Sequence, residues 1–104
     1  MISQYTSPEL FGSDIKLRNV IPANSVILAV VIHVYNDVTG TVTLQTEAVD
    51  ESTPSRILYI DYITGKGIYT GNSAKEYFIS EQNLLVKNTG SVNFKIKIIF
   101  WETE

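Results

Sequence analysis

The stretch that decides the fold runs from Ser91 to Glu102 and reads S-V-N-F-K-I-K-I-I-F-W-E. Apolar residues occupy every second position, and side chains alternate between the two faces of a strand. This pattern predicts a strand with one buried face and one wet face. The alternation then breaks, because Ile99 and Trp101 fall on the wet face, where Asn93, Lys95 and Lys97 also lie. We therefore expect a contact surface at the end of this strand. The expected buried set is Val92, Phe94, Ile96, Ile98 and Phe100.

Short runs of the same kind recur along the chain, separated by turn residues, and no window shows a sustained helical period. The run 26–35 is apolar on both faces, which is typical of a central strand that is covered on both sides. Six to eight short strands at regular spacing predict an all-β, antiparallel β-sandwich or jelly roll. The expected strands are 15–20, 26–35, 41–49, 56–63, 76–80, 84–88 and 91–102.

Residues 1–14 have no sustained period and are punctuated by Pro8 and Gly12, so we predict an extended N-terminal arm before a sandwich domain at 15–104. Four of its residues are too apolar for a free tail, and the arm is expected to lie across its own domain or across a neighbouring subunit. A frayed terminus is the alternative. The four residues are Ile2, Tyr5, Leu10 and Phe11.

Composition narrows the function. A chain of 104 residues forms one domain, and no cysteine is available as a nucleophile or a ligand. A net charge of −3, from 8 basic and 11 acidic residues, argues against binding to nucleic acid. The N-terminus lacks the pattern of a signal peptide, and the apolar run 26–34 is too short to span a bilayer as a helix. We expect no membrane association and synthesis in a cytoplasm.

Candidates for chemistry are weak. His33, the single histidine, lies between Ile32 and Val34, which favours a packed or edge-facing imidazole over a catalytic one. The acidic residues Glu47, Asp50 and Glu51 could hold Ca²⁺, but their spacing matches no EF-hand, and a solvated loop is the commoner outcome. The glycines at 65 and 67 lack the spacing of a phosphate-binding loop. We expect no enzyme activity and no catalytic, cofactor or metal site.

The tyrosines and the tryptophan are the more informative set, because aromatic rings on a sheet face bind sugars or other proteins. By register, Tyr62 is expected to point inward, while Tyr59 and Trp101 are expected outside. Cover by the arm, a symmetric oligomer or docking on a larger body would each explain exposed Ile99 and Trp101. The predicted partner interface is Ile2, Tyr5, Leu10, Phe11, Tyr59, Ile99 and Trp101.

The segment 21–34, I-P-A-N-S-V-I-L-A-V-V-I-H-V, resembles a segment of small structural proteins of tailed bacteriophages, with crAss-like phages as the suggested group. That family has I-P-A-G, a β-rich run, a Thr/Gly-rich hairpin and a closing amphipathic strand. The likeness covers about residues 15–49 and 84–102. It departs at Asn24, where glycine is usual. Asn tolerates a left-handed backbone better than most residues, so the turn is expected to survive.

The resemblance implies a non-enzymatic virion protein: a capsid auxiliary (decoration) protein that binds and stabilises the phage head, or a head-fibre, neck or tail subunit. It implies the major capsid protein or other virion proteins as partners, a homo-oligomer such as a trimer, and a place on the capsid exterior after synthesis in the bacterial cytoplasm. The aromatic residues leave a carbohydrate-binding β-sandwich module as the alternative.

Overall fold

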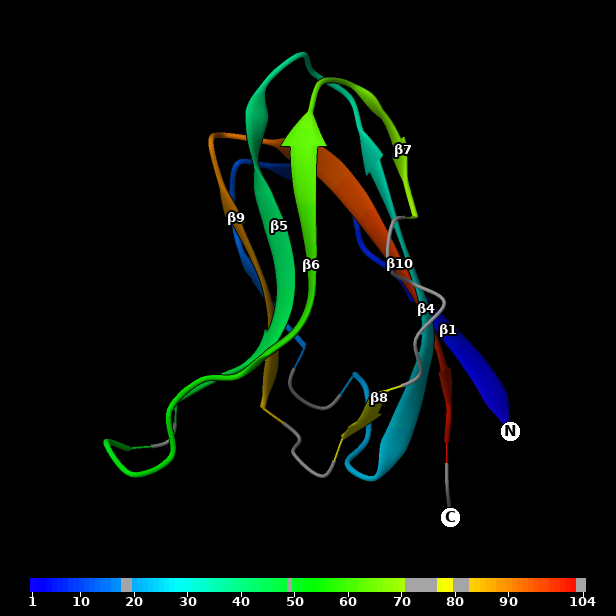
Figure 1. Ribbon diagram of the computed structural model, residues 1–104. Coiled ribbons are helices and arrows are strands. Elements are labelled where there is room, and N and C mark those ends of the chain that lie inside the picture. The colour runs from blue at the N-terminus through cyan, green and yellow to red at the C-terminus, as the bar shows by residue number, and fades with distance from the viewer. Residues whose placement is uncertain (18–19, 49, 71–76, 80–82, 103–104) are drawn as a thin grey trace.

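The computed structural model describes residues 1–17, 20–48, 50–70, 77–79 and 83–102. Within these ranges the chain forms strands and no helix, so no membrane-spanning helix is found there. Two antiparallel sheets pack face to face as a β-sandwich, which confirms the predicted fold class (Figure 1). Sheet A contains β1 (Ile2–Thr6), β2 (Leu10–Phe11), β4 (Ser25–Val34), β7 (Gly67–Tyr69), β8 (Tyr77–Ile79) and β10 (Asn93–Trp101). Sheet B contains β3 (Ile15–Lys16), β5 (Thr39–Thr46), β6 (Ile57–Thr64) and β9 (Leu84–Thr89).

The strands are ordered as in a jelly roll. Sheet A runs β1-β10-β4-β7, with β2 also on β10 and β8 also on β4, while sheet B runs β3-β9-β5-β6. The last strand, β10, therefore lies inside sheet A between the first strand and the central strand β4. Both chain ends lie together at one end of this sheet (Figure 1).

The core fills the space between the inward faces of the two sheets, as the alternation in β10 predicts. Phe94, Ile96 and Ile98 are fully buried there. The opposite wall comes from β5, β6 and β9, whose inward residues are equally buried. Core residues of sheet B include Val42, Leu44, Tyr59, Ile63, Leu84 and Val86.

The outer face of β4 departs from prediction. The strand is central in sheet A, but its outward residues Val26, Leu28 and Val31 are only half-buried, and His33 is exposed. No described element lies over this side of the sheet. The apolar residues on both faces of this strand predict that both faces are covered. In the structure the outer face is apolar but partly open to solvent.

The register of β6 corrects the orientation predicted for two tyrosines. Tyr59 is 3% exposed and points into the core, while Tyr62 is 67% exposed. The cause is a register shift, because Leu44 pairs with Tyr59 whereas Gln45 pairs with Ile57, which leaves Leu58 as an extra residue. A bulge of this kind reverses which residues face the core. No local feature of the sequence indicates it.

The segment 1–14, predicted as an extended arm, contributes two strands to sheet A of its own chain. Each residue of β1 pairs with β10, from Ile2 opposite Trp101 to Thr6 opposite Lys97. Further along, Leu10 of β2 pairs with Phe94. Between β1 and β2, the Ser7 hydroxyl accepts a hydrogen bond from the Ile96 amide of β10 at 3.0 Å. This bond holds the connecting segment against β10.

Other differences concern the limits of elements. The glycine-rich stretch after β6 contains β7, which was not predicted, and the strand expected at 76–80 is described only at Tyr77–Ile79. The rest of that expected strand lies outside the described residues. Asn24 has a φ of 65°, so the turn before β4 uses the left-handed conformation, which asparagine tolerates better than most residues.

Candidate functional site

The outer face of sheet A is the candidate site, because exposed apolar side chains collect on it. The pairing of β1 and β4 with β10 aligns three rows of outward residues at the end of the sheet near the chain termini and in its centre. A register shift leaves Leu28 of β4 as an extra residue between the first two rows. The rows are Ile2–Trp101–Val26, Gln4–Ile99–Ala29 and Thr6–Lys97–Val31. The face continues toward the other end of the sheet with Lys95, His33, Ile68, Phe11, Asn93 and Tyr35.

The first row, together with Ile99 of the second, forms an apolar patch. We call it the Trp101 patch and define it as Ile2, Val26, Ile99 and Trp101. Ile2 is 65% exposed and Trp101 is 44% exposed. These two residues are opposite one another in the β1–β10 pairing, and Val26 is opposite Trp101 on the other side. Directly opposed side chains lie about 4.5–5.5 Å apart at Cβ. The patch is therefore one contiguous surface rather than scattered apolar residues.

The other end of the same face carries a second exposed group. His33 and Tyr35, two residues apart and on the same side, stack with ring centroids 4.2 Å apart. Ile68 of β7 is paired with His33 and is 69% exposed. Phe11 of β2 is also exposed, opposite Asn93. These residues flank Lys95 and Lys97, which separate them from the Trp101 patch.

The structure brings together only some of the predicted interface residues. Ile2, Ile99 and Trp101 form one patch, and Phe11 lies on the same face at its far end. The remaining three point inward. Leu10 and Tyr59 belong to the core, and Tyr5 packs against it, where burial raises the pKa of its phenol.

Three exposed residues were missed as part of this surface: His33, Tyr35 and Ile68. The odd-numbered alternation of β4 places His33 and Tyr35 on the same side as Val31, and this was available from the sequence. Ile68 was hidden in a stretch read as a flexible turn. Only the pairing of β7 with β4 brings it beside His33.

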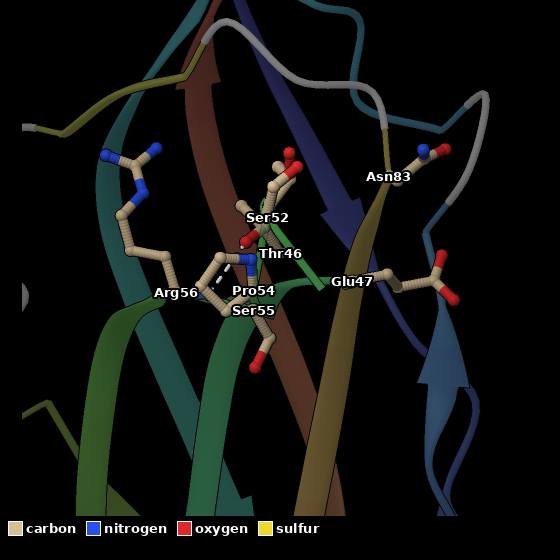
Figure 2. Close-up of a pocket in the computed structure, with 8 residues that line it drawn as sticks. Thr46, Glu47, Ser52, Pro54, Ser55, Arg56 and Asn83 are labelled. Atoms are coloured by element: carbon tan, nitrogen blue, oxygen red, sulfur yellow. Dashed lines mark hydrogen bonds between the residues drawn. The ribbon is translucent and has the colours of Figure 1, made fainter. Parts of the chain in front are cut away.

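A hollow lies at the end of sheet B, where the loop after β5 returns to β6. It encloses about 440 Å³ and is lined by Thr46, Glu47, Ser52, Thr53, Pro54, Ser55, Arg56 and Asn83. Figure 2 shows the Arg56 side chain on one side of the loop and Glu47 and Asn83 on the other.

Polar groups around this hollow hold the loop. The Arg56 amide donates to the Thr46 hydroxyl at 2.8 Å, and Lys16 forms a salt bridge with Glu47. Asp50 accepts hydrogen bonds from the Ser52 hydroxyl and from the amides of Ser52 and Thr53. The Ser52 hydroxyl bond is the main reason that the pKa of Asp50 is below its usual value. These contacts assign the acidic loop a structural role, an Asx turn.

Comparison with known proteins adds little. No protein-family model and no curated protein matches the chain. Among solved structures it is similar to the crystal structure of PirA, with 12% identity over 96% of this chain and 93% of that one, at a TM-score of 0.45. A likeness this weak supports no inference about function.

Proposed function

We propose that this chain is a non-enzymatic structural protein of a tailed phage: a capsid auxiliary protein that binds and stabilises the head through the outer face of sheet A. The observation that carries the proposal is the Trp101 patch. Large apolar side chains that remain exposed on one contiguous face are typical of a surface that a partner covers. Tryptophan in particular is enriched among the residues that dominate binding energy.

The identity of the partner comes from the resemblance at residues 21–34 to phage structural proteins, with the major capsid protein or another virion protein as the binding surface. The protein would act on the capsid exterior after synthesis in the host cytoplasm, as a homo-oligomer, with a trimer as the expected number. A head-fibre, neck or tail subunit would use the same surface on a different virion partner.

Binding to empty phage heads tests the proposal. Heads of the phage that encodes the chain would be incubated with purified protein, and bound protein measured after sedimentation. Trp101→Ser should lower the apparent affinity by at least about thirtyfold, because a central tryptophan contributes 2 kcal/mol or more at an interface. A truncation of residues 1–12 would be a poor alternative because it removes β1 and β2.

Tyr62→Ser is the matched control. Tyr62 is an exposed aromatic residue on sheet B, so its loss changes surface hydrophobicity by a similar amount on the other side of the molecule. Its affinity for heads should stay within about threefold of wild type, as expected for a residue outside the contact. Equal binding by wild type and Trp101→Ser would contradict docking through this face. Absence of binding by the wild type would contradict the capsid as partner.

A carbohydrate-binding module is the second candidate, favoured by the exposed, stacked rings of His33 and Tyr35, since flat rings are suited to sugar faces. Saturable binding on a glycan array that is lost in Tyr35→Ala would support it.

A further inference from the structure

Next to the Trp101 patch, the outer face of sheet A is hollowed into a groove of about 220 Å³. We call it the lysine groove and define it by Val31, His33, Tyr35, Ile68, Lys95 and Lys97. Strands β4, β7 and β10 supply most of its lining, and Thr6 of β1 lies at its border. Lys95 is paired with His33 and Lys97 with Val31 across β10 and β4, and Ile68 of β7 is paired with His33. Each lysine of β10 therefore lies beside an apolar or aromatic residue of β4.

The charge of this surface differs from that of the whole protein. The chain carries a net charge of −3, yet no aspartate or glutamate occurs in any described strand of sheet A. Neither lysine of the groove forms a salt bridge with a described residue. The salt bridge found among the described residues joins Lys16 and Glu47, on the side of sheet B. A positive surface attracts negative groups of a partner protein, and sheet A has no acidic residue in its described strands that would repel them.

The spacing of the lysines defines what would fit. Lys95 and Lys97 lie on one face of a strand two residues apart, so their Cα atoms are about 6.6 Å apart. Carboxylates at positions i and i+2 of an extended segment have the same separation. The next residue on that side, i+4, would lie toward the stacked rings of His33 and Tyr35.

We propose that the lysine groove binds an extended acidic segment of the partner protein with the pattern Glu/Asp-x-Glu/Asp-x-aromatic. Its two carboxylates pair with Lys95 and Lys97, and its aromatic side chain packs on the His33–Tyr35 stack and Ile68. This inference rests on the proposed function, because it gives the chemistry of the partner surface that meets the outer face of sheet A. The Trp101 patch supplies the apolar part of the contact, and the lysine groove supplies its charge selectivity.

Peptide binding tests the groove directly. A fluorescein-labelled peptide Glu-Thr-Glu-Thr-Phe is titrated with the full-length chain and followed by fluorescence anisotropy, with Lys-Thr-Lys-Thr-Phe as its charge-reversed counterpart. The acidic peptide should bind and the basic one should not. Binding should weaken steadily as salt is raised, since partly exposed charges are screened. The double variant Lys95→Glu/Lys97→Glu should bind at least about tenfold more weakly, as charge reversal at a contact predicts.

The double variant Lys66→Glu/Lys87→Glu is the matched control. It has the same net charge but changes lysines outside the groove, and it should bind the acidic peptide within about twofold of wild type. Trp101→Ser should also leave peptide binding unchanged. Equal affinity for the acidic and the basic peptide would overturn the proposal. So would tighter binding of a dT oligonucleotide or of a neutral glycan, which would assign the groove to nucleic acid or to sugar.

Phage heads separate a failure of this inference from a failure of the proposed function. Heads that bind Lys95→Glu/Lys97→Glu as well as wild type would overturn the groove while leaving capsid binding in place. Peptide binding with the predicted selectivity, but no binding to heads, would support the groove and overturn the capsid as partner.

Discussion

The part of sheet B formed by β5 and β9 presents a different kind of outer surface from sheet A. On sheet B the outward side chains of β5 and β9 are polar except for Leu85, and the threonines and the glutamine bond to one another and to the backbone. The Thr41 and Thr89 hydroxyls are 2.8 Å apart, and the Thr43 hydroxyl contacts Gln45 Oε1 at 2.8 Å and the Lys87 carbonyl at 3.4 Å. On sheet A most of the outward side chains are apolar or cationic, although Gln4, Thr6 and Asn93 are polar, and the two lysines form no salt bridge with a described residue.

The difference teaches where to look for function in a small all-β chain. A sheet face whose polar groups are satisfied by one another is adapted to solvent, because removing it from water brings little gain. A face where Ile2 and Trp101 are exposed, and where the lysines form no salt bridge with a described residue, gains from being covered. This contrast is why the proposed interaction is placed on sheet A.

The largest expected effect tests sheet B as a tightly closed unit. At Gly40 of β5, an added Cβ would collide with the Thr89 carbonyl and lie 3.1 Å from Val92 Cγ2. Gly40→Ala should therefore destabilise the protein by about 3 kcal/mol or more, as overpacking against backbone does. Urea denaturation measures it. Thr39→Ala, one residue away and exposed, should change stability by about 0.5 kcal/mol or less.

The second effect compares the two faces with a matched pair of substitutions. Thr43→Val on sheet B removes a nearly buried hydroxyl and leaves its acceptors without that donor, which should cost about 1–2 kcal/mol of unfolding free energy. The reverse change on sheet A, Val31→Thr, places a hydroxyl where solvent can reach it and should cost less than about 0.5 kcal/mol. Similar losses in both variants would remove the distinction between the faces.

Most of the fold could be predicted from the sequence because the core strands alternate regularly. The alternation in β10 identifies its buried residues without error, and the both-sided apolar pattern of β4 correctly predicts a central strand. The predictions that were wrong, the orientations of Tyr59 and Tyr62, depend on how strands pair. The bulge in β6 that exchanges Tyr59 and Tyr62 arises from its register with β5, and no residue in β6 announces it.

The candidate site shows the same division. Trp101 and Ile99 interrupt a regular pattern, so the sequence alone places them on the outward face, where Trp101 is exposed and Ile99 is half-buried. Ile2 joins them only because β1 pairs with β10 in one particular register, and Ile68 joins His33 only because β7 pairs with β4. Surfaces built from several strands require long-range pairing, which local periodicity does not contain.

The third prediction concerns the free edge of sheet B. β6 pairs with β5 alone among the described strands, and its outward Ile57 and Tyr62 are exposed, so it could add strands from other molecules. Asp61, an acid that points toward the inner side of this strand, opposes such pairing because two copies would bring like charges together.

Asp61→Asn keeps an acceptor for the Tyr59 hydroxyl, which now donates to Asp61 Oδ2 at 2.8 Å, while removing the charge. Self-association measured by sedimentation should increase by about tenfold, equivalent to 1.4 kcal/mol. Glu51→Gln, with the same net charge but in an exposed loop, should leave it unchanged. An Asp61→Asn variant that sediments as the wild type does would show that the edge is protected by some other feature.

The smallest effect tests how firmly β1 is part of sheet A. Burial raises the pKa of Tyr5, so the fold favours the neutral phenol. Its contribution to stability is then complete below the unfolded pKa of about 10 and is lost as the pH rises through the higher folded value. Tyr5→Phe cannot ionise, so its unfolding free energy should decline less than that of wild type above about pH 10. Gln4→Ala, on the outward side of the same strand, keeps the phenol and should retain the wild-type decline.

Identical alkaline profiles for Tyr5→Phe and wild type would mean that Tyr5 is as accessible to water as in the unfolded chain. In that case β1 would be only loosely held to β10, and the Trp101 patch that depends on their pairing would lose Ile2.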